Sequence, residues 1–388
     1  MKVLNVLGTR PEAIKMAPVI RELERYSPEM SSVVCATGQH REMLDQMLRI
    51  FSIHPDYDLD VMTAEQSVVS LACRILKGLE EVLSAEQPDL VLVQGDTTTT
   101  AMAALAGFYN RVPVGHIEAG LRTGSRYFPF PEEINRRLTT VLATYHFAPT
   151  RSAVEALLRE GVPPRQVFLT GNPVVDALQL ILDTTTPPTF PFIEPGRRII
   201  LVTAHRRESF GAPLENICKA LREIADEHAD VLVVYAVHLN PNIWGPVHSL
   251  LDGHPRIKLI PPQEYVSFVH LMNQAYLVLT DSGGIQEEAP ALGKPVLVLR
   301  HETERIEAVQ ADTARLVGTD PHQIVHWTNS LLNDGVLYER MACAMSPYGD
   351  GSAAERIVRI VRQVAQGGTP ETVDAQLASQ VWCDYRLG

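Results

Sequence analysis

The chain has 388 residues, of which 45% are hydrophobic and 21% are charged, and its formal net charge is -12. This length suits two domains of similar size, because a single hydrophobic core rarely grows so large. The negative charge argues against nonspecific binding to nucleic acid, which needs a basic surface. No run approaches the ~20 apolar residues of a membrane span, and the N-terminal apolar run is too short for a signal peptide, so we expect a cytoplasmic protein without a membrane partner.

The first half alternates short apolar runs with amphipathic stretches, which predicts strands followed by helices. The predicted strands are residues 2–8, 31–37, 89–93, 113–117 and 145–148. The predicted helices are about 11–25, 40–50, 66–85, 97–109, 132–143 and 150–160. Alternation of this kind is typical of right-handed βαβ units around a parallel sheet.

A proline-rich segment at residues 184–191 reads as a linker, and a second series of elements follows it. Its predicted strands are 198–203, 231–236, 256–260, 276–280 and 295–299. We therefore predict two doubly wound, Rossmann-like α/β domains, residues 1–183 and 196–359, with ligand sites at the carboxyl ends of their strands. A C-terminal helix of about residues 360–388 is expected to pack back on the first domain.

Cysteines give no sign of a metal or a disulfide framework. Five of them, Cys35, Cys73, Cys218, Cys343 and Cys383, are scattered without any C-x-x-C spacing. The sequence also contains no H-E-x-x-H motif, no Walker A sequence and no dinucleotide fingerprint that follows a predicted strand, so we expect no metal site and no cofactor.

Basic side chains follow the first strand of each half. One turn contains Arg10, with Lys15 one helical turn later, and the other contains His205 and Arg206. We expect Arg10 and His205 to bind one diphosphate from opposite sides of a cleft. The alternative is that the arginines are surface residues and that His205 is a satisfied polar group.

The segment 276–296 reads as a strand, a glycine turn, the start of a helix and a second strand. Backbone N–H groups of Ser282, Gly283 and Gly284 can bind a diphosphate at the positive end of a helix. The carboxylate of Glu288 is then placed to accept hydrogen bonds from a ribose diol. An ordinary glycine turn with an acidic first helical turn is the alternative.

Acidic residues lie at two further strand ends and at one helix start. Asp96 follows residues 90–95, and its alternative role is to cap the helix from Thr97. Glu118 follows residues 113–117, where a carboxylate has little structural reason to be. Glu132 and Glu133 open a helix, where the helix dipole alone explains an acid. Carboxylates that converge on one cleft suit proton transfer.

Taken together, six motifs closely resemble the non-hydrolysing UDP-N-acetylglucosamine 2-epimerases over roughly residues 1–365: Gly8-Thr9-Arg10-Pro11-Glu12, Gln94-Gly95-Asp96-Thr97-Thr98-Thr99, His116-Ile117-Glu118-Ala119-Gly120-Leu121-Arg122, Pro131-Glu132-Glu133-Ile134-Asn135-Arg136, Thr203-Ala204-His205-Arg206-Arg207-Glu208 and Thr280-Asp281-Ser282-Gly283-Gly284. The resemblance implies a glycosyltransferase-B-like fold, a homodimer, and no nicotinamide or metal. It also implies reversible interconversion of UDP-GlcNAc and UDP-ManNAc, which feeds polysaccharide biosynthesis.

The resemblance also assigns roles to residues. It implies that Arg10, Lys15 and His205 stabilise the leaving diphosphate, and that Asp96, Glu118 and Glu132 transfer the proton or position the sugar, with no base assigned to either face. The implied UDP contacts are Arg10, His205, Phe268, Ser282, Gly283, Gly284 and Glu288. Phe268 matches an aromatic residue beside the uracil, although helix core is its alternative.

One region departs from the family pattern. The implied second, regulatory nucleotide-sugar site contains Gln39, His40, Arg206 and His238, but Glu42 and Glu65 stand where activated members have a glutamine and an arginine. Carboxylates would repel an anionic ligand, so we expect substrate activation to be weakened or absent.

Three other functions remain open at this point. They are a 2-epimerase of a related diacetamido nucleotide sugar, a glycosyltransferase of the same fold and a non-catalytic nucleotide-sugar sensor. A glycosyltransferase would not explain the three carboxylates.

Overall fold

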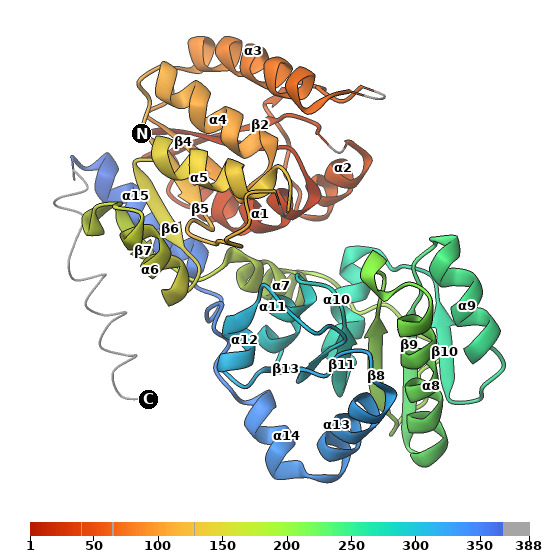
Figure 1. Cartoon of the computed structure of the whole chain (residues 1–388). Coiled ribbons are helices and arrows are strands. Elements are labelled where there is room, and N and C mark those ends of the chain that lie inside the picture. Colours follow the sequence, from red (N-terminus) through yellow and green to blue (C-terminus); the bar gives the residue numbers. More distant parts are fainter. Residues whose placement is uncertain (40, 64–65, 128, 368–388) are drawn as a thin grey trace. The chain divides into compact units, whose positions relative to one another are not determined.

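The computed structural model of the chain describes residues 1–39, 41–63, 66–127 and 129–367 (Figure 1). The chain divides into two compact units. Unit 1 contains Met1–Ala177 and the segment from Tyr348 onward, and unit 2 contains Leu178–Pro347. The division falls inside helix α7 (Pro173–Thr184) and before the proline-rich segment 184–191. The predicted boundaries, 1–183 and 196–359, stay a prediction.

Unit 1 forms a seven-stranded sheet in which all paired strands are parallel, with the order β3-β2-β1-β4-β5-β6-β7. Its strands are β1 (Lys2–Leu7), β2 (Ser31–Ala36), β3 (Tyr57–Asp58), β4 (Leu90–Gln94), β5 (Val114–Ile117), β6 (Tyr145–Ala148) and β7 (Val167–Leu169). Its helices are α1 (Arg10–Glu24), α2 (Arg41–Ile50), α3 (Val68–Glu86), α4 (Thr98–Tyr109), α5 (Glu132–Leu142), α6 (Arg151–Arg159), the first part of α7, and α15 (Ala353–Ala365).

Helices cover both faces of this sheet because successive strand residues point to opposite sides. Leu4 and Val6 of β1 pack with Ile75 and Leu79 of α3 in one buried cluster. Helix α4 contacts α3 and α5 on that side, and α1 contacts α2 and α15. Continuous apolar strands such as β4, all five residues of which are buried, follow from this two-sided burial.

Unit 2 forms a six-stranded sheet, again with parallel pairs, in the order β10-β9-β8-β11-β12-β13. Its strands are β8 (Arg198–Thr203), β9 (Val231–Ala236), β10 (Ile257–Ile260), β11 (Leu277–Thr280), β12 (Val296–Val298) and β13 (Ala314–Leu316). Its helices are α8 (Ala212–Glu227), α9 (Pro241–Leu251), α10 (Tyr265–Gln274), α11 (Ile285–Ala291), α12 (Ile306–Gln310), α13 (Pro321–Asn333) and α14 (Gly335–Ala342).

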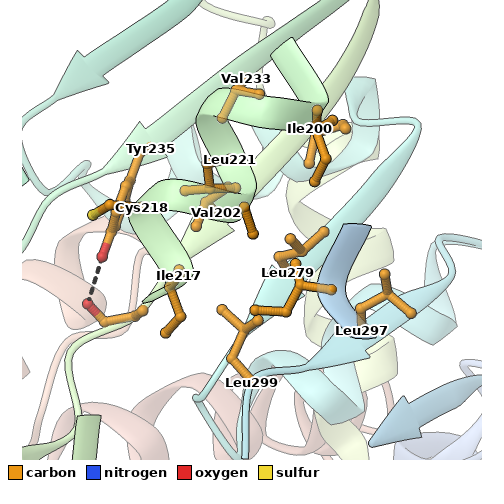
Figure 2. Close-up of a cluster of buried hydrophobic side chains, with 14 of the residues drawn as sticks. Ile200, Val202, Ile217, Cys218, Leu221, Val233, Tyr235, Leu279, Leu297 and Leu299 are labelled. Atoms are coloured by element: carbon orange, nitrogen blue, oxygen red, sulfur yellow. Dashed lines mark hydrogen bonds between the residues drawn. The ribbon is translucent and has the colours of Figure 1, made fainter. Parts of the chain in front are cut away.

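The core of unit 2 joins its central strands to helix α8. Val202 and Leu279, from two neighbouring strands, pack with Leu221 of α8 in a fully buried cluster (Figure 2). Burial raises the pKa of Tyr235 well above its ordinary value, so its hydroxyl stays protonated. That hydroxyl donates a hydrogen bond of 3.1 Å to the carbonyl of Ala204, shown as a dashed line in Figure 2. The core therefore fixes the backbone just before His205.

The strand order places a switch point in each sheet. In unit 1 the order reverses between β1 and β4, and in unit 2 it reverses between β8 and β11. Doubly wound sheets bind ligands at the carboxyl ends of the strands on either side of such a point. The segments that follow these four strands contain Arg10, Asp96, His205 and Ser282.

The structure confirms the predicted fold class, and the predicted strands all form. Three short strands were missed: β3, β7 and β13, which have two or three residues each. Such segments are too short to show either alternation or a continuous apolar run. Residues 185–197 form no helix or strand, which suits the proline-rich composition of that segment.

The C-terminal part of the chain that the structure describes ends with α15, which contacts α1. Arg362 of α15 lies 4.9 Å from the ring of Tyr26 and pairs with Glu29 at 3.1 Å. The remainder of the predicted C-terminal helix, residues 368–388, lies outside the described residues. Among the described helices, none is long and apolar enough to span a membrane.

Candidate active site

The turn after β1 is tied to the turn after β4 by one buried carboxylate. Glu12 accepts hydrogen bonds from the backbone N–H groups of Gly8 (2.8 Å) and Thr9 (2.7 Å). It also accepts from the hydroxyls of Thr97 (2.5 Å) and Thr100 (3.0 Å). Burial raises the pKa of Glu12, although these hydrogen bonds oppose the shift. Glu12 thus holds the turn after β1 and the turn after β4 together at the switch point of unit 1.

Gly8 is required by the close packing of this turn. A Cβ at this position would lie 2.2 Å from Thr37 Oγ1 and 2.4 Å from Thr99 Oγ1. The two hydroxyls are themselves hydrogen-bonded at 2.9 Å. Gln39, predicted for the regulatory site, accepts from the Thr99 hydroxyl at 2.9 Å. It therefore lies beside the same turn.

Glu118 is the most constrained of the predicted acidic residues. It follows β5, it is 9% exposed, and its φ of 67° lies in the left-handed region. A residue other than glycine in this region costs of the order of 1–3 kcal/mol, and such strain gathers at functional sites. Its Oε2 forms an ion pair with Lys15 Nζ and accepts a hydrogen bond of 2.6 Å from Gln94 Nε2. Lys15 and Gln94 thus aim this carboxylate at the switch point.

Asp96 does not cap the helix that follows it. Thr97 is the N-cap of α4, and its hydroxyl accepts from Thr100 N–H at 3.2 Å. The Asp96 carboxylate instead binds Arg136 Nη2 at 2.5 Å, and the Asp96 carbonyl accepts from Asn135 Nδ2 at 2.9 Å. The capping role considered for Asp96 is therefore wrong.

The two glutamates that open α5 have different environments. Glu133 is fully buried and pairs with Arg136 (3.2 Å) and Arg137 (3.0 Å), and it accepts from Thr123 N–H at 3.1 Å. Although burial alone would raise the pKa of Glu133, these hydrogen bonds lower it below its ordinary value. Glu132 is half-buried, and its buried Oε2 has no hydrogen-bond partner within the described parts of the chain. Of these two glutamates, Glu132 is therefore the one with an unpaired carboxylate oxygen among the described residues.

Two buried histidines, His116 of β5 and His146 of β6, lie opposite each other in the sheet. His116 Nε2 lies 2.7 Å from the carbonyl of Gly95. Burial lowers the pKa of His116 to about 4 and that of His146 to about 3. Both rings are therefore neutral at pH 7, and His116 supports the backbone beside Asp96.

Asp281 organises the corresponding turn of unit 2. Its buried carboxylate accepts from the backbone N–H groups of His205 and Arg206, both at 2.8 Å, and from the Ser209 hydroxyl at 3.2 Å. His205 Nδ1 lies 3.4 Å from Asp281 Oδ1. Burial lowers the pKa of His205, and the charge of Asp281 opposes this shift. The imidazole ring of His205 stacks on that of His238 at a centroid distance of 5.7 Å.

The glycine turn before α11 is flanked by two arginines. Ser282 N–H donates to the Thr280 hydroxyl at 3.0 Å, which shapes the turn. A Cβ on Gly283 would lie 3.7 Å from Arg206 Nη2 and 3.9 Å from Arg305 Nη2, and Gly284 is the N-cap of α11. Positive charge thus lies beside the backbone that is predicted to bind a diphosphate.

The other predicted residues lie near the ends of their elements. Arg10 opens α1 and is exposed, and Glu288 is half-buried in the first turn of α11. Phe268 is half-buried on α10, whereas its neighbour Val269 is fully buried. His238 is exposed, and its Nδ1 accepts from Asn240 N–H at 3.1 Å.

Two members of the predicted regulatory region, His40 and Glu65, lie outside the described residues. Glu42 is exposed in the first turn of α2.

The structure therefore gathers the predicted residues into two groups. In unit 1, Lys15, Asp96 and Glu118 lie at the ends of β4 and β5 and on α1. In unit 2, His205 and Ser282 flank Asp281. Sequence reasoning gave no role to several supporting residues, including Glu12, Gln94, Asn135, Arg136, Asp281 and Arg305. All of these except Arg305 stand inside the quoted motifs, so their positions in those motifs were the available signal.

Two Rossmann-like sheets with charged side chains at their switch points are typical of enzymes that bind nucleotide sugars in the glycosyltransferase-B-like fold. The sequence matches the family model for UDP-N-acetylglucosamine 2-epimerase over residues 21–362. The UDP-N-acetylglucosamine 2-epimerase of Yersinia pestis is 56% identical over 371 residues, covering 93% of this chain and 98% of that protein. The enzyme of the same name from Escherichia coli K12 is 54% identical with the same coverage.

A comparison with solved structures also finds similarity to UDP-GlcNAc 2-epimerases. The crystal structure of UDP-GlcNAc 2-epimerase from Neisseria meningitidis bound to UDP-GlcNAc has a TM-score of 0.84 and 50% identity, and the match covers 94% of this chain and all of that one. The chain belongs to the UDP-N-acetylglucosamine 2-epimerase family. It is an isomerase, and its fold is glycosyltransferase-B-like.

Proposed function

We propose that the protein interconverts UDP-GlcNAc and UDP-ManNAc by eliminating UDP and adding it back, through 2-acetamidoglucal. The proton on carbon 2 is not beside a carbonyl, so a side-chain base cannot remove it at neutral pH without help. When UDP leaves with the electron pair of its bond to carbon 1, positive charge grows at carbon 1 and acidifies that proton. Loss of the proton gives the carbon 1–carbon 2 double bond. Protonation from the other face, with return of UDP, inverts carbon 2.

The observation that carries this proposal is the geometry of Glu118. A buried carboxylate in a left-handed backbone conformation, held by Lys15 of α1 and by Gln94 at the end of β4, is a preorganised proton acceptor. Asp96 and Glu132 supply two further carboxylates in the same unit. The reaction needs proton acceptors and donors for two faces of the sugar, and three carboxylates can meet that need.

The leaving diphosphate requires positive charge and backbone N–H groups. We assign this role to Arg10, Lys15 and His205, with Ser282, Gly283 and Gly284 as backbone contacts. Arg206 and Arg305 beside Gly283 support this assignment. Each well-aimed donor contributes about 3 kcal/mol to the stabilisation of the departing anion.

We place the nucleoside in unit 2. Glu288 accepts from the ribose diol, and the half-buried ring of Phe268 lies against the uracil. That the Neisseria meningitidis relative was solved bound to UDP-GlcNAc supports UDP-GlcNAc as the ligand.

The test is hydrogen exchange at carbon 2. Purified protein is incubated with UDP-GlcNAc in heavy water without any acceptor, and the products are analysed by NMR. We expect deuterium at carbon 2 together with UDP-ManNAc. A glycosyltransferase or a sensor would introduce none, so the absence of deuterium would refute the proposal.

A pair of variants sharpens this test. Glu118→Gln keeps the size of the side chain but removes the acceptor, and we expect its exchange rate to fall about 100-fold or more. Glu155→Gln makes the same change on an exposed residue of α6 and should exchange as the wild type does. Parallel assays on a diacetamido nucleotide sugar would identify the alternative substrate.

We also propose a homodimer that uses helices α4 and α5. These contacting helices expose large apolar side chains at Phe108, Tyr109, Leu138 and Val141, whose exposed fractions are 58%, 71%, 47% and 83%. Apolar groups so exposed on adjacent helices are typical of an interface.

Finally, we propose that substrate activation is weak in this protein. The reason is the charge of Glu42 and Glu65 at positions where activated relatives have a glutamine and an arginine.

A further inference from the structure

Arg136 links the candidate base Asp96 to a buried anchor. Its Nη2 binds Asp96 Oδ2 at 2.5 Å and its Nη1 binds Glu133 Oε2 at 3.2 Å. The Arg136 side chain is 12% exposed and Glu133 is fully buried. One planar guanidinium therefore spans two carboxylates, a geometry that lysine cannot reproduce.

The anchor is itself held in place. Glu133 accepts from Thr123 N–H at 3.1 Å and pairs with Arg137 at 3.0 Å through its other oxygen. Because these contacts fix the orientation of the Glu133 carboxylate, the guanidinium group of Arg136 has one favourable orientation. That orientation directs Nη2 toward Asp96.

Asp96 is held from two sides by consecutive residues of α5. Asn135 Nδ2 donates to its carbonyl at 2.9 Å while Arg136 holds its carboxylate. Because Arg136 binds Oδ2, the other oxygen, Oδ1, is the one left to face a substrate.

We propose that Arg136 is a positioning residue for epimerisation, which acts by aiming the Asp96 carboxylate, and that Glu133 is its anchor. This inference rests on the function proposed above. It gives the N-terminal part of α5 a second role besides supplying Glu132, because Arg136 sets the direction of a carboxylate that lies 40 residues earlier in the sequence.

Arg137 provides a matched control because it shares Glu133 with Arg136 but makes no contact with Asp96 among the described residues. We compare Arg136→Gln, Arg136→Lys and Arg137→Gln. For each variant, kcat and KM for UDP-GlcNAc, deuterium incorporation at carbon 2, and UDP affinity by calorimetry are measured.

We expect kcat of Arg136→Gln to fall about 100-fold, the cost typical of a misplaced catalytic group, while UDP affinity stays unchanged. Arg136→Lys should recover part of this loss, because it keeps the charge but not the fork. Arg137→Gln should lower kcat far less than Arg136→Gln, because Thr123 N–H and Arg136 still hold Glu133 and Arg136 still holds Asp96. In an Asp96→Asn background, Arg136→Gln should cost nothing further.

Each contrary outcome is decisive. Wild-type kcat in Arg136→Gln, or equal losses in Arg136→Gln and Arg137→Gln, would overturn the inference and leave the proposed function standing. Loss of UDP affinity in parallel with kcat would show a general structural role and also overturn it. If Arg136→Gln does not fold, the test rests on Arg136→Lys. A wild-type kcat in that variant would show that the guanidinium group is not needed and would refute the inference. Absence of deuterium exchange in the wild type would instead refute the proposed function itself.

Discussion

Asp176 makes the stability of unit 1 depend on pH. This residue of α7 is 8% exposed, and its carboxylate accepts from the first two N–H groups of α15, at 3.2 Å from Ala353 and 2.8 Å from Ala354. Burial raises the pKa of Asp176 to about 6, and the charge of Asp350 adds to the rise, whereas the helix N–H groups oppose it. Replacing Asp176 with asparagine keeps one acceptor oxygen and removes the ionisation.

The size of the effect follows from the difference between the folded pKa of about 6 and the ordinary value of 3.8. A difference of about 2 pKa units corresponds to about 3 kcal/mol in the free energy of unfolding. Because the folded pKa is raised, this stability is fully present below pH 3.8 and is lost as the pH rises through about 6. The folded wild type therefore bears the full cost of the buried charge at pH 7, and the asparagine variant does not.

The assay compares the melting temperatures of wild type and Asp176→Asn at several values between about pH 4.5 and pH 7.5. We expect the variant to gain stability relative to the wild type as the pH rises, by roughly 5–10 °C in melting temperature for a unit of this size. A difference that does not change with pH would refute the reasoning. Activity measured at each pH serves as the control for correct folding.

Three further predictions follow from other parts of the structure. Gly8→Ala should lower both the melting temperature and kcat, because its methyl group would collide with the hydroxyls of Thr37 and Thr99; wild-type values of both would contradict the packing. Val141→Glu should convert the proposed dimer to a monomer in light scattering coupled to gel filtration, and an unchanged mass would exclude this surface. The rate of the wild type should depend hyperbolically on UDP-GlcNAc concentration, whereas a sigmoidal curve abolished by His238→Ala would show that substrate activation persists.

Most strands of both sheets could be predicted from sequence because they are short, largely buried apolar runs, whereas β3, β7 and β13 are too short and too exposed to show this pattern. Hydrogen bonds and ion pairs between residues far apart in the sequence could not be predicted in this way. The resemblance identified Asp96 as a candidate, but Arg136, which aims it, lies 40 residues away. Local patterns left Asp96 with a capping role that Thr97 in fact performs.

The backbone conformation of Glu118 and the burial of Glu133 could not be predicted from the sequence either. Nothing in the residues around Glu118 predicted a left-handed backbone, and its partners Lys15 and Gln94 come from other elements. The helix dipole accounted for the acid at Glu133, and its ion pairs with Arg136 and Arg137 are local contacts at i,i+3 and i,i+4 spacing. Its complete burial, in contrast, is a result of tertiary packing that local patterns do not show.

The division of the chain has a consequence for its synthesis. Unit 2 is one continuous segment, whereas unit 1 takes in α15 only after all of unit 2 has been synthesised. Until then the surface of α1 that α15 covers, and Tyr26 just after α1, stay open to water or to chaperones. At ordinary rates of translation this interval lasts roughly 10 to 40 s. A chain truncated before Ala353 should therefore contain every residue of unit 2 but lack the last described helix of unit 1.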